Sequence, residues 1–176
     1  MAEPSSPAPV AIIVMGPSSV GKTTTAQMIA AELGWPFAEA DEFHPPQNIE
    51  KMSAGIPLND ADRQPWLETI RDWISGQAAE GRSVVLTCSA LKRRYRDTLR
   101  GARARVRFLE LVASKALVAE RMAQRTGHYM PTSLLDSQFA DLEELHDDED
   151  GVKIDVGPPP QTVRDQSLLA LGLKGA

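Results

Sequence analysis

The chain has 176 residues, and its 24 acidic residues against 19 basic ones give a formal net charge of -5. This balance excludes a uniformly basic surface, so we expect no nucleic-acid partner. The length predicts one domain, and because no apolar run approaches the roughly 18 residues of a membrane span, we also expect no membrane partner.

Residues 1–9 are rich in Pro, Ser and Ala and predict a flexible N-terminal tail, because they offer little apolar surface to offset the entropy of ordering. They also lack the basic start and the apolar middle of a signal peptide. A single cysteine, Cys88, excludes a disulfide framework and fits a reducing compartment. We therefore expect a cytoplasmic protein in which residues 10–176 form one domain.

Short apolar runs typical of strands that helices cover on both faces recur along the chain. They lie at residues 10–15, 37–40, 84–88, 106–112 and 152–156, of which the second is the weakest. Helical patterns lie between them. The clearest is at residues 60–77, where Trp66 and Trp73 share the apolar face and are predicted to be core residues. This alternation predicts an α/β fold with a mostly parallel sheet wrapped by helices.

The first predicted strand leads directly into the phosphate-binding pattern Gly, four residues, Gly, Lys, Ser or Thr, at residues 16–23. In such a loop the amides turn inward, Lys22 brings positive charge to the outer phosphates, and the Thr23 hydroxyl ligates Mg²⁺. The predicted nucleotide-binding residues are Gly16, Ser18, Ser19, Val20, Gly21, Lys22, Thr23 and Thr24. An ordinary glycine turn is the alternative, but the helical pattern that follows favours an anion site. We therefore predict that the chain binds ATP or GTP.

Two carboxylates, Glu39 and Asp41, come at the end of the second predicted strand. Because the C-terminal ends of parallel strands border the ligand crevice, we expect both near the phosphate loop. A carboxylate there can accept the proton of an acceptor hydroxyl or hold Mg²⁺ through water. The alternative is a solvated acidic turn.

Several short motifs combine with the phosphate loop into a pattern that closely resembles the small bacterial and eukaryotic gluconokinases. The motifs are residues 40–45 (ADEFHP), 48–52 (NIEKM), 55–60 (GIPLND), 62–63 (DR), 65–67 (PWL), 88–92 (CSALK), 95–97 (YRD), 127–129 (GHY) and 137–139 (SQF). The resemblance covers roughly residues 10–156. The first motif and the one at residues 88–92 are not general features of phosphate-loop proteins, so the resemblance is specific.

This resemblance implies the three-layer P-loop kinase fold of the shikimate and nucleoside-monophosphate kinases. That fold has a five-stranded parallel sheet of order 2-3-1-4-5, helices on both faces, and here a helical lid at about residues 122–146. The implied activity is the ATP-dependent phosphorylation of D-gluconate to 6-phospho-D-gluconate for the pentose phosphate or Entner-Doudoroff routes. The resemblance also suggests a cytoplasmic homodimer that uses Mg²⁺.

The resemblance further implies roles for individual residues. Lys22, Asp41 and Arg125 are implied to be catalytic, and Thr23 and Asp41 to hold Mg²⁺. Arg121 and Arg125, which lie four apart on one helix face, are implied to fold over ATP. The implied gluconate-binding residues are Asp41, His44, Arg63, Lys92, His128 and Gln138. Among them Arg63 is our candidate for gripping the carboxylate, since a guanidinium offers a planar, two-pronged donor.

Simpler alternatives stay open for several of these residues. His44 is alternatively a loop histidine, Lys92 a solvated lysine and Gln138 a surface amide, and the two lid arginines are alternatively solvated. Glu39 stands where many family members carry aspartate, which leaves its magnesium role in doubt. For the whole protein, the alternatives are a related kinase acting on shikimate or a nucleoside monophosphate, and a nucleotide-binding regulatory module without catalysis.

The net charge conceals two opposite blocks. Residues 92–107 hold eight basic residues and one acid, a net of +7, whereas residues 141–150 hold seven acids and no Lys or Arg, a net of -7. RNA binding would call for more interleaved aromatics than Tyr95 and Phe108. We therefore interpret the basic block as a solvated helix and loop with one end at an anionic substrate pocket.

Overall fold

The computed structural model describes residues 8–17, 19–124 and 132–173. In this part of the chain the strands form one parallel sheet in the order β2-β3-β1-β4-β5. The strands are β1 (Val10–Met15), β2 (Phe37–Glu39), β3 (Val84–Thr87), β4 (Arg105–Val112) and β5 (Gly151–Asp155). The predicted strand order is confirmed, and each predicted strand boundary lies within one residue of the observed one.

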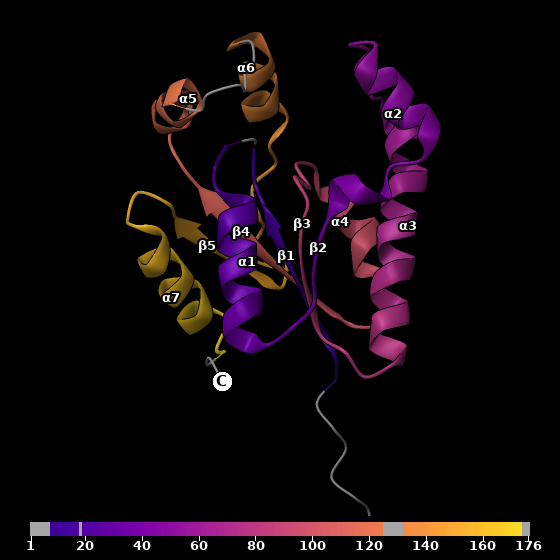
Figure 1. Cartoon of the computed structure of the whole chain (residues 1–176), viewed down its shortest axis with the longest axis vertical. Helices are drawn as coiled ribbons and strands as arrows, with labels where there is room; N and C mark the ends of the chain where they lie inside the picture. Colours follow the sequence, from indigo (N-terminus) through magenta and orange to yellow (C-terminus); the bar gives the residue numbers. More distant parts are fainter. Residues whose placement is uncertain (1–7, 18, 125–131, 174–176) are drawn as a thin grey trace, which may run out of the picture.

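Helices connect the strands and cover both faces of the sheet (Figure 1). They are α1 (Lys22–Leu33), the 3-10 helix η1 (Ala40–Phe43), α2 (Pro46–Ser53), α3 (Asp60–Ala79), α4 (Arg93–Arg100), α5 (Lys115–Gln124), α6 (Thr132–Asp141) and α7 (Pro160–Ala170). In Figure 1, α1 and α7 lie on one side of the sheet and α3 and α4 on the other. These are the three layers that the resemblance implies.

Alternate residues of β1 supply two separate hydrophobic cores, because successive side chains of a strand point to opposite faces. Ala11 and Ile13 pack in the core beneath α3 and α4, whereas Ile12 and Val14 pack in the core beneath α1 and α7. All four are fully buried. Burial on both faces explains why the strand appears in the sequence as a continuous apolar run rather than as an alternating one.

The two tryptophans of α3 differ in their surroundings. Trp66 is 6% exposed and belongs to the core as predicted. Trp73 is only partly buried and packs at the edge of this core, with its ring centroid 5.4 Å from that of Phe43.

A capping box fixes the start of α3. The Asn59 side chain accepts a hydrogen bond from the Asp62 backbone N–H at 2.8 Å, and the Asp62 carboxylate accepts one from the Asn59 N–H at 3.0 Å. Lys51 of α2 adds an ion pair to Asp62 at 2.8 Å. The first turn of α3 is therefore rigidly placed, and it carries Arg63.

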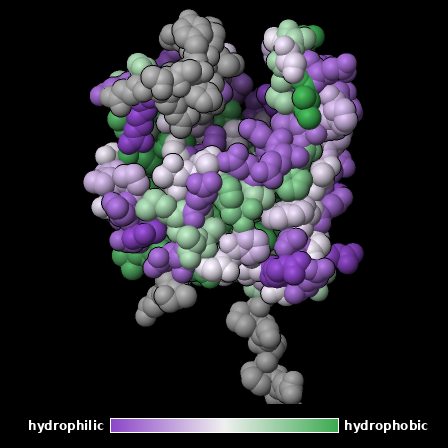
Figure 2. Space-filling view, in the orientation of Figure 1, coloured by the Kyte–Doolittle hydropathy of each residue, from purple (hydrophilic) through white to green (hydrophobic). Residues whose placement is uncertain are grey.

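Helix α2 stands beyond the C-terminal edge of the sheet (Figure 1) and exposes a hydrophobic patch at its tip (Figure 2). The patch consists of Ile49, Met52 and Ile56, which are 52%, 45% and 50% exposed. Its opposite side is anchored by the buried Asn48, whose side-chain N–H donates to the Asp62 carbonyl at 2.9 Å. The helix is therefore amphipathic and docked along one edge.

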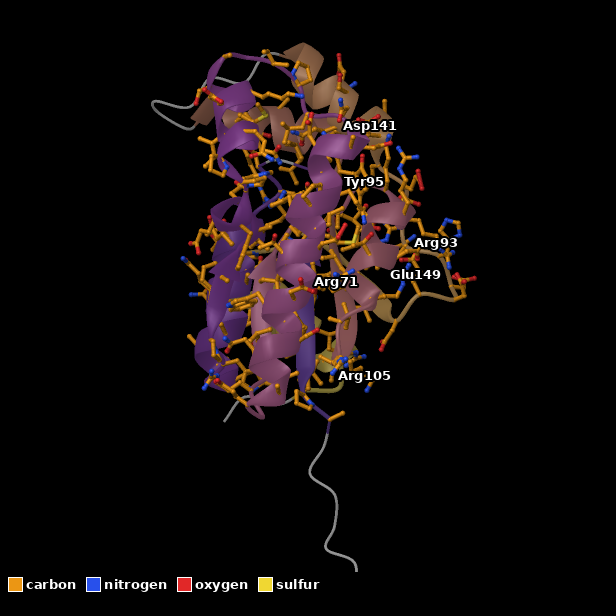
Figure 3. The ribbon with its side chains drawn as sticks, turned by 90° about the vertical axis from the view of Figure 1, so that its right-hand side faces the viewer. Arg71, Arg93, Tyr95, Arg105, Asp141 and Glu149 are labelled. Carbon is orange, nitrogen blue, oxygen red and sulfur yellow. The ribbon has the colours of Figure 1, made fainter. Side chains whose placement is uncertain are left out.

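The basic and acidic blocks pair with each other, and Figure 3 shows Arg93 and Glu149 close together beside α4. The pairs are Arg93–Asp148, Arg96–Glu149, Arg100–Glu149, Arg105–Asp150 and Arg107–Asp150. The Arg96 and Glu149 side chains are both fully buried. The interpretation of this block as a solvated helix and loop is therefore wrong for its middle, because a buried acid that is distant in sequence takes up the charge.

Two of the predicted regions extend outside the described residues. Most of the predicted N-terminal tail, residues 1–7, lies there, and so do residues 125–131 of the predicted lid. Helix α5 ends just before residues 125–131, and α6 begins just after them. Helix α6 ends at Asp141, within the predicted lid. Among the described residues, no helix combines the length and apolar character needed to cross a membrane.

Candidate functional site

The phosphate loop joins β1 to α1 through a strained turn that only glycine accommodates. Gly16 and Gly21 have φ angles of 141° and 100°, both positive. A Cβ on Gly16 would lie 3.1 Å from the Leu111 carbonyl oxygen and 3.1 Å from the Val20 side chain. At Gly16 both the backbone angle and the close neighbours therefore disfavour a side chain, whereas at Gly21 the positive φ alone does, because nothing lies within 4 Å of an added Cβ.

Lys22 folds back over this loop. Its Nζ donates hydrogen bonds to the carbonyl oxygens of Gly16 at 2.7 Å and Pro17 at 3.3 Å. Burial lowers the pKa of Lys22 to about 8, and the nearby Cys88, Asp41 and Glu39 oppose this shift. Neutral carbonyls thus hold the ammonium group, and its charge is left for an anion in the loop.

The acids predicted beside the loop do meet it. Thr23 Oγ1, in the first turn of α1, donates to Glu39 Oε1 at 2.8 Å. Asp41 lies in η1 with its side chain 90% exposed and Oδ1 3.9 Å from His44 Nε2. Hydroxyl and carboxylate oxygens of the kind that Mg²⁺ prefers therefore gather at the C-terminal end of β2.

A cavity of about 260 Å³ lies beside the start of α1. It is lined by Val20, Gly21, Thr24, Thr25, Arg121, Val156, Pro158, Pro160 and Val163. Arg121 of α5 donates from Nη2 to the Val156 carbonyl at 2.6 Å and so holds the loop after β5 against the cavity. This cavity can take the base and ribose of a nucleotide whose phosphates lie in the loop. It contains Thr24 and Arg121, as the sequence predicts for the nucleotide side.

A second, smaller pocket lies between α3 and the segment that leads into α4. It is lined by Arg63, Trp66, Ser89, Leu91, Lys92, Tyr95 and Asp141. The Ser89 carbonyl also accepts a hydrogen bond from the Gly16 N–H at 3.3 Å, so the pocket adjoins the phosphate loop. Among the described residues, neither Arg63 nor Lys92 has an acid within ion-pair distance. The pocket therefore holds two cations that form no ion pair, although the carboxylate of Asp141 also lines it.

His44 lies beside this second pocket, stacked on Trp66 with ring centroids 4.4 Å apart and ring planes 10° from parallel. The Trp66 indole N–H donates to the Ala40 carbonyl at 2.7 Å, which fixes the plane of the stack. Burial and then the charge of Arg63 lower the pKa of His44, while Asp41 opposes them. At neutral pH His44 is therefore uncharged. It can form a hydrogen bond to an anion but contributes no positive charge to binding it.

Of the remaining predicted site residues, the structure describes Gln138 and not the other three. Ser18, Arg125 and His128 lie outside the described residues. Gln138 lies on α6, one turn before Asp141, and does not line the pocket, whereas Asp141 does.

Four residues that line the second pocket were not predicted from the sequence, namely Tyr95, Ser89, Leu91 and Asp141, and Trp66 was predicted to be a core residue alone. Tyr95, Ser89 and Leu91 stand inside motifs of the resemblance, which was the available signal. Asp141 had no signal beyond its place in the acidic block.

Comparisons with known proteins agree with this geometry. A family model described as an AAA domain matches residues 12–146. A gluconokinase from Gluconobacter oxydans (strain 621H) is 48% identical over 157 residues, which make up 89% of this chain and 88% of that protein. The chain belongs to the AAA domain family and to the gluconokinase family. Membership confirms the resemblance seen in the motifs.

Solved structures of gluconokinase-family and related proteins share the architecture. A sugar kinase from Janibacter sp. HTCC2649 is 47% identical, with a TM-score of 0.87 over 94% of this chain and 95% of that one. A gluconokinase from Sinorhizobium meliloti 1021 is 44% identical, with a TM-score of 0.81 over 94% of this chain and 93% of that one. The P-loop kinase fold predicted from the sequence is thereby confirmed.

Proposed function

We propose that this protein is an ATP-dependent gluconokinase, which transfers the outer phosphoryl group of ATP to the 6-hydroxyl of D-gluconate and releases 6-phospho-D-gluconate. One observation carries the choice of acceptor. The pocket beside the phosphate loop holds Arg63 and Lys92 without acidic partners among the described residues. Two cations that share a small pocket with one acid, Asp141, and form no ion pair favour an anionic acceptor. Family membership favours gluconate among such acceptors.

The residues divide the chemistry between them. Lys22 neutralises charge on the transferring phosphoryl group, as in other P-loop enzymes. Asp41 is exposed at the mouth of the site and acts as the base that accepts the proton of the 6-hydroxyl. Arg63 and Lys92 bind the carboxylate end of gluconate, so that the opposite end of the sugar acid faces the phosphate loop. Two of the predicted roles, those of Arg125 and His128, fall outside the described residues.

The residues present also fit Mg²⁺. The described part of the chain contains no cluster of three His, Cys, Asp or Glu side chains. Mg²⁺ in kinases needs no such cluster, because phosphate oxygens and waters fill most of its shell. The Thr23 hydroxyl, Glu39 and Asp41 are the oxygen ligands available here, and Glu39 reaches the Thr23 hydroxyl directly. When bound, Mg²⁺ would neutralise developing charge on the phosphates.

A coupled assay with ATP and three acceptors, gluconate, shikimate and AMP, tests the proposal. We expect 6-phosphogluconate from gluconate and no comparable turnover of the other two. Turnover of shikimate or AMP without turnover of gluconate would assign the protein to a related kinase activity. Measurable ATP binding with no turnover of any acceptor would instead favour a nucleotide-binding regulatory module.

We further propose that the enzyme works in the cytoplasm as a homodimer, which rests on the resemblance of its motifs to gluconokinases. Light scattering after size-exclusion chromatography measures the assembly. We expect a mass of about twice the 19.2 kDa of one chain. A mass equal to one chain over the working concentration range would remove the dimer from the proposal.

A further inference from the structure

A series of hydrogen bonds runs from the second pocket, hereafter the acceptor pocket, to the surface of α3. Arg63 Nη1 lies 3.0 Å from the Tyr95 hydroxyl, and that hydroxyl lies 2.5 Å from Asp60 Oδ1. Arg63 and Asp60 belong to the first turn of α3, whereas Tyr95 reaches them from α4. Tyr95 is 7% exposed, so the middle of this series is buried.

The donors and acceptors in this series of hydrogen bonds follow from the chemistry of Arg63 and Asp60 at its two ends. A guanidinium can only donate hydrogen bonds, and an ionised carboxylate can only accept them. The Tyr95 hydrogen bond is the first cause that lowers the pKa of Asp60, and Arg94 adds to it, so Asp60 is ionised at neutral pH. The Tyr95 hydroxyl therefore donates to Asp60 and turns its lone pairs toward Arg63.

This arrangement holds the guanidinium without neutralising it. A carboxylate in the place of the Tyr95 hydroxyl would position Arg63 equally well but would cancel its charge. The Tyr95 oxygen carries no charge, and the acid lies one hydrogen bond further away. Among the described residues, the Arg63 side chain makes no other hydrogen bond, so the remaining N–H groups of its guanidinium are available to a ligand in the pocket that it lines.

The Tyr95 ring also contacts the second cation of the pocket. The Arg63 Cζ atom lies 5.5 Å from the ring centroid, and Lys92 Nζ lies 5.9 Å from it. One aromatic side chain therefore lies against both positive groups. Figure 3 labels Tyr95 in the upper half of the view, as it does Asp141, which lines the same pocket. A ring face attracts a cation yet leaves its formal charge intact.

We propose that Tyr95, oriented by Asp60, is a positioning residue that aims the Arg63 guanidinium at the carboxylate of the acceptor and so sets the preference for a sugar acid over a neutral sugar. The inference rests on the proposed function. In it Tyr95 touches neither the phosphoryl group nor the reacting hydroxyl. Loss of its hydroxyl should therefore weaken binding of the acceptor and leave the chemical step intact.

A purely structural role is the competing explanation, since Tyr95 joins α3 to α4. The chain offers a matched control for it. Gln64 of α3 and Thr98 of α4 form a second hydrogen bond between the same two helices at 3.5 Å, and neither lines the pocket. Thr98→Val removes a hydroxyl from this link as Tyr95→Phe removes one from the first.

The experiment measures KM and kcat of wild type, Tyr95→Phe and Thr98→Val with D-gluconate and with D-gluconamide, the neutral amide of the same acid. For Tyr95→Phe we expect the KM for gluconate to rise about tenfold with kcat within about twofold of wild type, the pattern of lost uniform binding. We expect no matching rise for gluconamide and no change of either constant in Thr98→Val. Parallel changes for the acid and the amide, or equal changes in the two variants, would overturn the proposal.

A double-mutant cycle shows whether Tyr95 acts through Arg63. If it does, Tyr95→Phe adds nothing to the KM for gluconate in an Arg63→Ala background. Additive effects would mean that Tyr95 works independently and would reject the positioning role. Asp60→Asn keeps the size of the side chain but weakens the acceptor for the Tyr95 hydroxyl, so we expect it to raise the same KM by a smaller factor. An unchanged KM in Asp60→Asn would remove Asp60 from the proposal.

Calorimetric titration of gluconate into each variant gives a readout independent of turnover, and thermal unfolding shows that each variant folds. The outcomes separate the two proposals. If the wild-type protein neither binds nor phosphorylates gluconate, the proposed function fails. If the wild type does both and Tyr95→Phe binds gluconate as tightly, only the role of Tyr95 fails.

Discussion

Two groups of basic residues differ in the partners that hold them. One group is the arginines of α4 and β4, and the other is the cations of the phosphate loop and the acceptor pocket. Arg96 is fully buried and donates to both oxygens of Glu149, at 2.7 and 3.0 Å, while Arg100 donates to the same carboxylate at 2.8 Å. Arg63 and Lys22 instead meet a tyrosine hydroxyl and backbone carbonyls. The first group has its charge cancelled by an acid, whereas the second group keeps it.

This difference separates the structural cations from the functional ones. A buried ion pair with all its hydrogen bonds made contributes to a unique packing, and removing one partner leaves the other charged and desolvated. A cation held by neutral groups has been positioned without using up its attraction for an anion. We therefore expect basic residues held by neutral groups, rather than those paired with acids, to bind an anionic ligand, whether or not they are buried.

The largest expected effect is a loss of stability when an acid of the paired arginines is removed. Glu149→Gln leaves the fully buried Arg96 without a countercharge and leaves Arg100 only its pair with Asp97. We expect the free energy of unfolding to fall by about 3–5 kcal/mol. Urea denaturation measures it. Asp148→Asn is the control, because it breaks the more exposed Arg93–Asp148 pair and should lower the free energy of unfolding much less. Equal losses in the two variants would show that burial of the pair does not matter.

Acid should remove part of the same free energy. Burial by itself would raise the pKa of Glu149, but hydrogen bonds from Arg96 and Arg100 lower it from 4.5 to about 2. A carboxylate with a lowered folded-state pKa contributes stability that is present above its unfolded pKa and is lost as the pH falls. Stability should therefore decrease between pH 4.5 and about 2. The gap between wild type and Glu149→Gln should narrow over this range, and a constant gap would contradict the assignment.

On the unpaired side, Lys22→Ala should have the largest effect on activity. The charge on the transferring phosphoryl group would go uncompensated, and we expect kcat to fall about 100-fold or more. Formation of 6-phosphogluconate measures it, with thermal unfolding to confirm a folded variant. Activity within about tenfold of wild type, or about 1.4 kcal/mol of barrier, would be too high for the role given to Lys22.

Arg63→Ala should have a smaller effect on activity than Lys22→Ala. It tests most directly whether a cation without an acidic partner binds the ligand. Loss of a charged donor to the carboxylate should raise the KM for gluconate about 10- to 100-fold with a smaller change in kcat. Arg71→Ala is the matched control, because Arg71 lies further along α3 and pairs with the exposed Asp72. We expect its kinetics to equal those of wild type. An unchanged KM in Arg63→Ala would remove Arg63 from the carboxylate role.

Much of the fold could be predicted from local patterns. The strand runs, the glycine pattern of the phosphate loop and the helix that carries Trp66 all follow from residues close in sequence, and so their types and approximate ends were correct. The phosphate loop was equally accessible, since strand, loop and helix are continuous there. The strand order came from the resemblance, because apolar runs carry no record of which neighbour they join.

The acceptor pocket was only partly accessible for the same reason. Arg63, Tyr95 and Asp141 come from three distant segments and share one small pocket. The motifs pointed to Arg63 and Lys92, but they did not show that Tyr95 and Asp60 hold Arg63 in place. The spacing of residues in the chain contains no information about a hydrogen bond that spans 32 positions.

The sequence by itself indicated the strands, the helices and the phosphate loop, because each depends on contiguous residues whose conformation is set by local sterics and periodicity. It indicated the family, and with it the strand order, through motifs spread over residues 10–156. Only the tertiary structure decided how the charges are distributed. The blocks of +7 and -7 are fixed in the chain. Which of their members form ion pairs depends on folding. Folding brings Asp148 and Glu149 against α4 and leaves Lys92 and Arg63, among the described residues, without an acid at ion-pair distance. Electrostatic pairing acts through space over a few ångströms, and distance along the chain does not determine it.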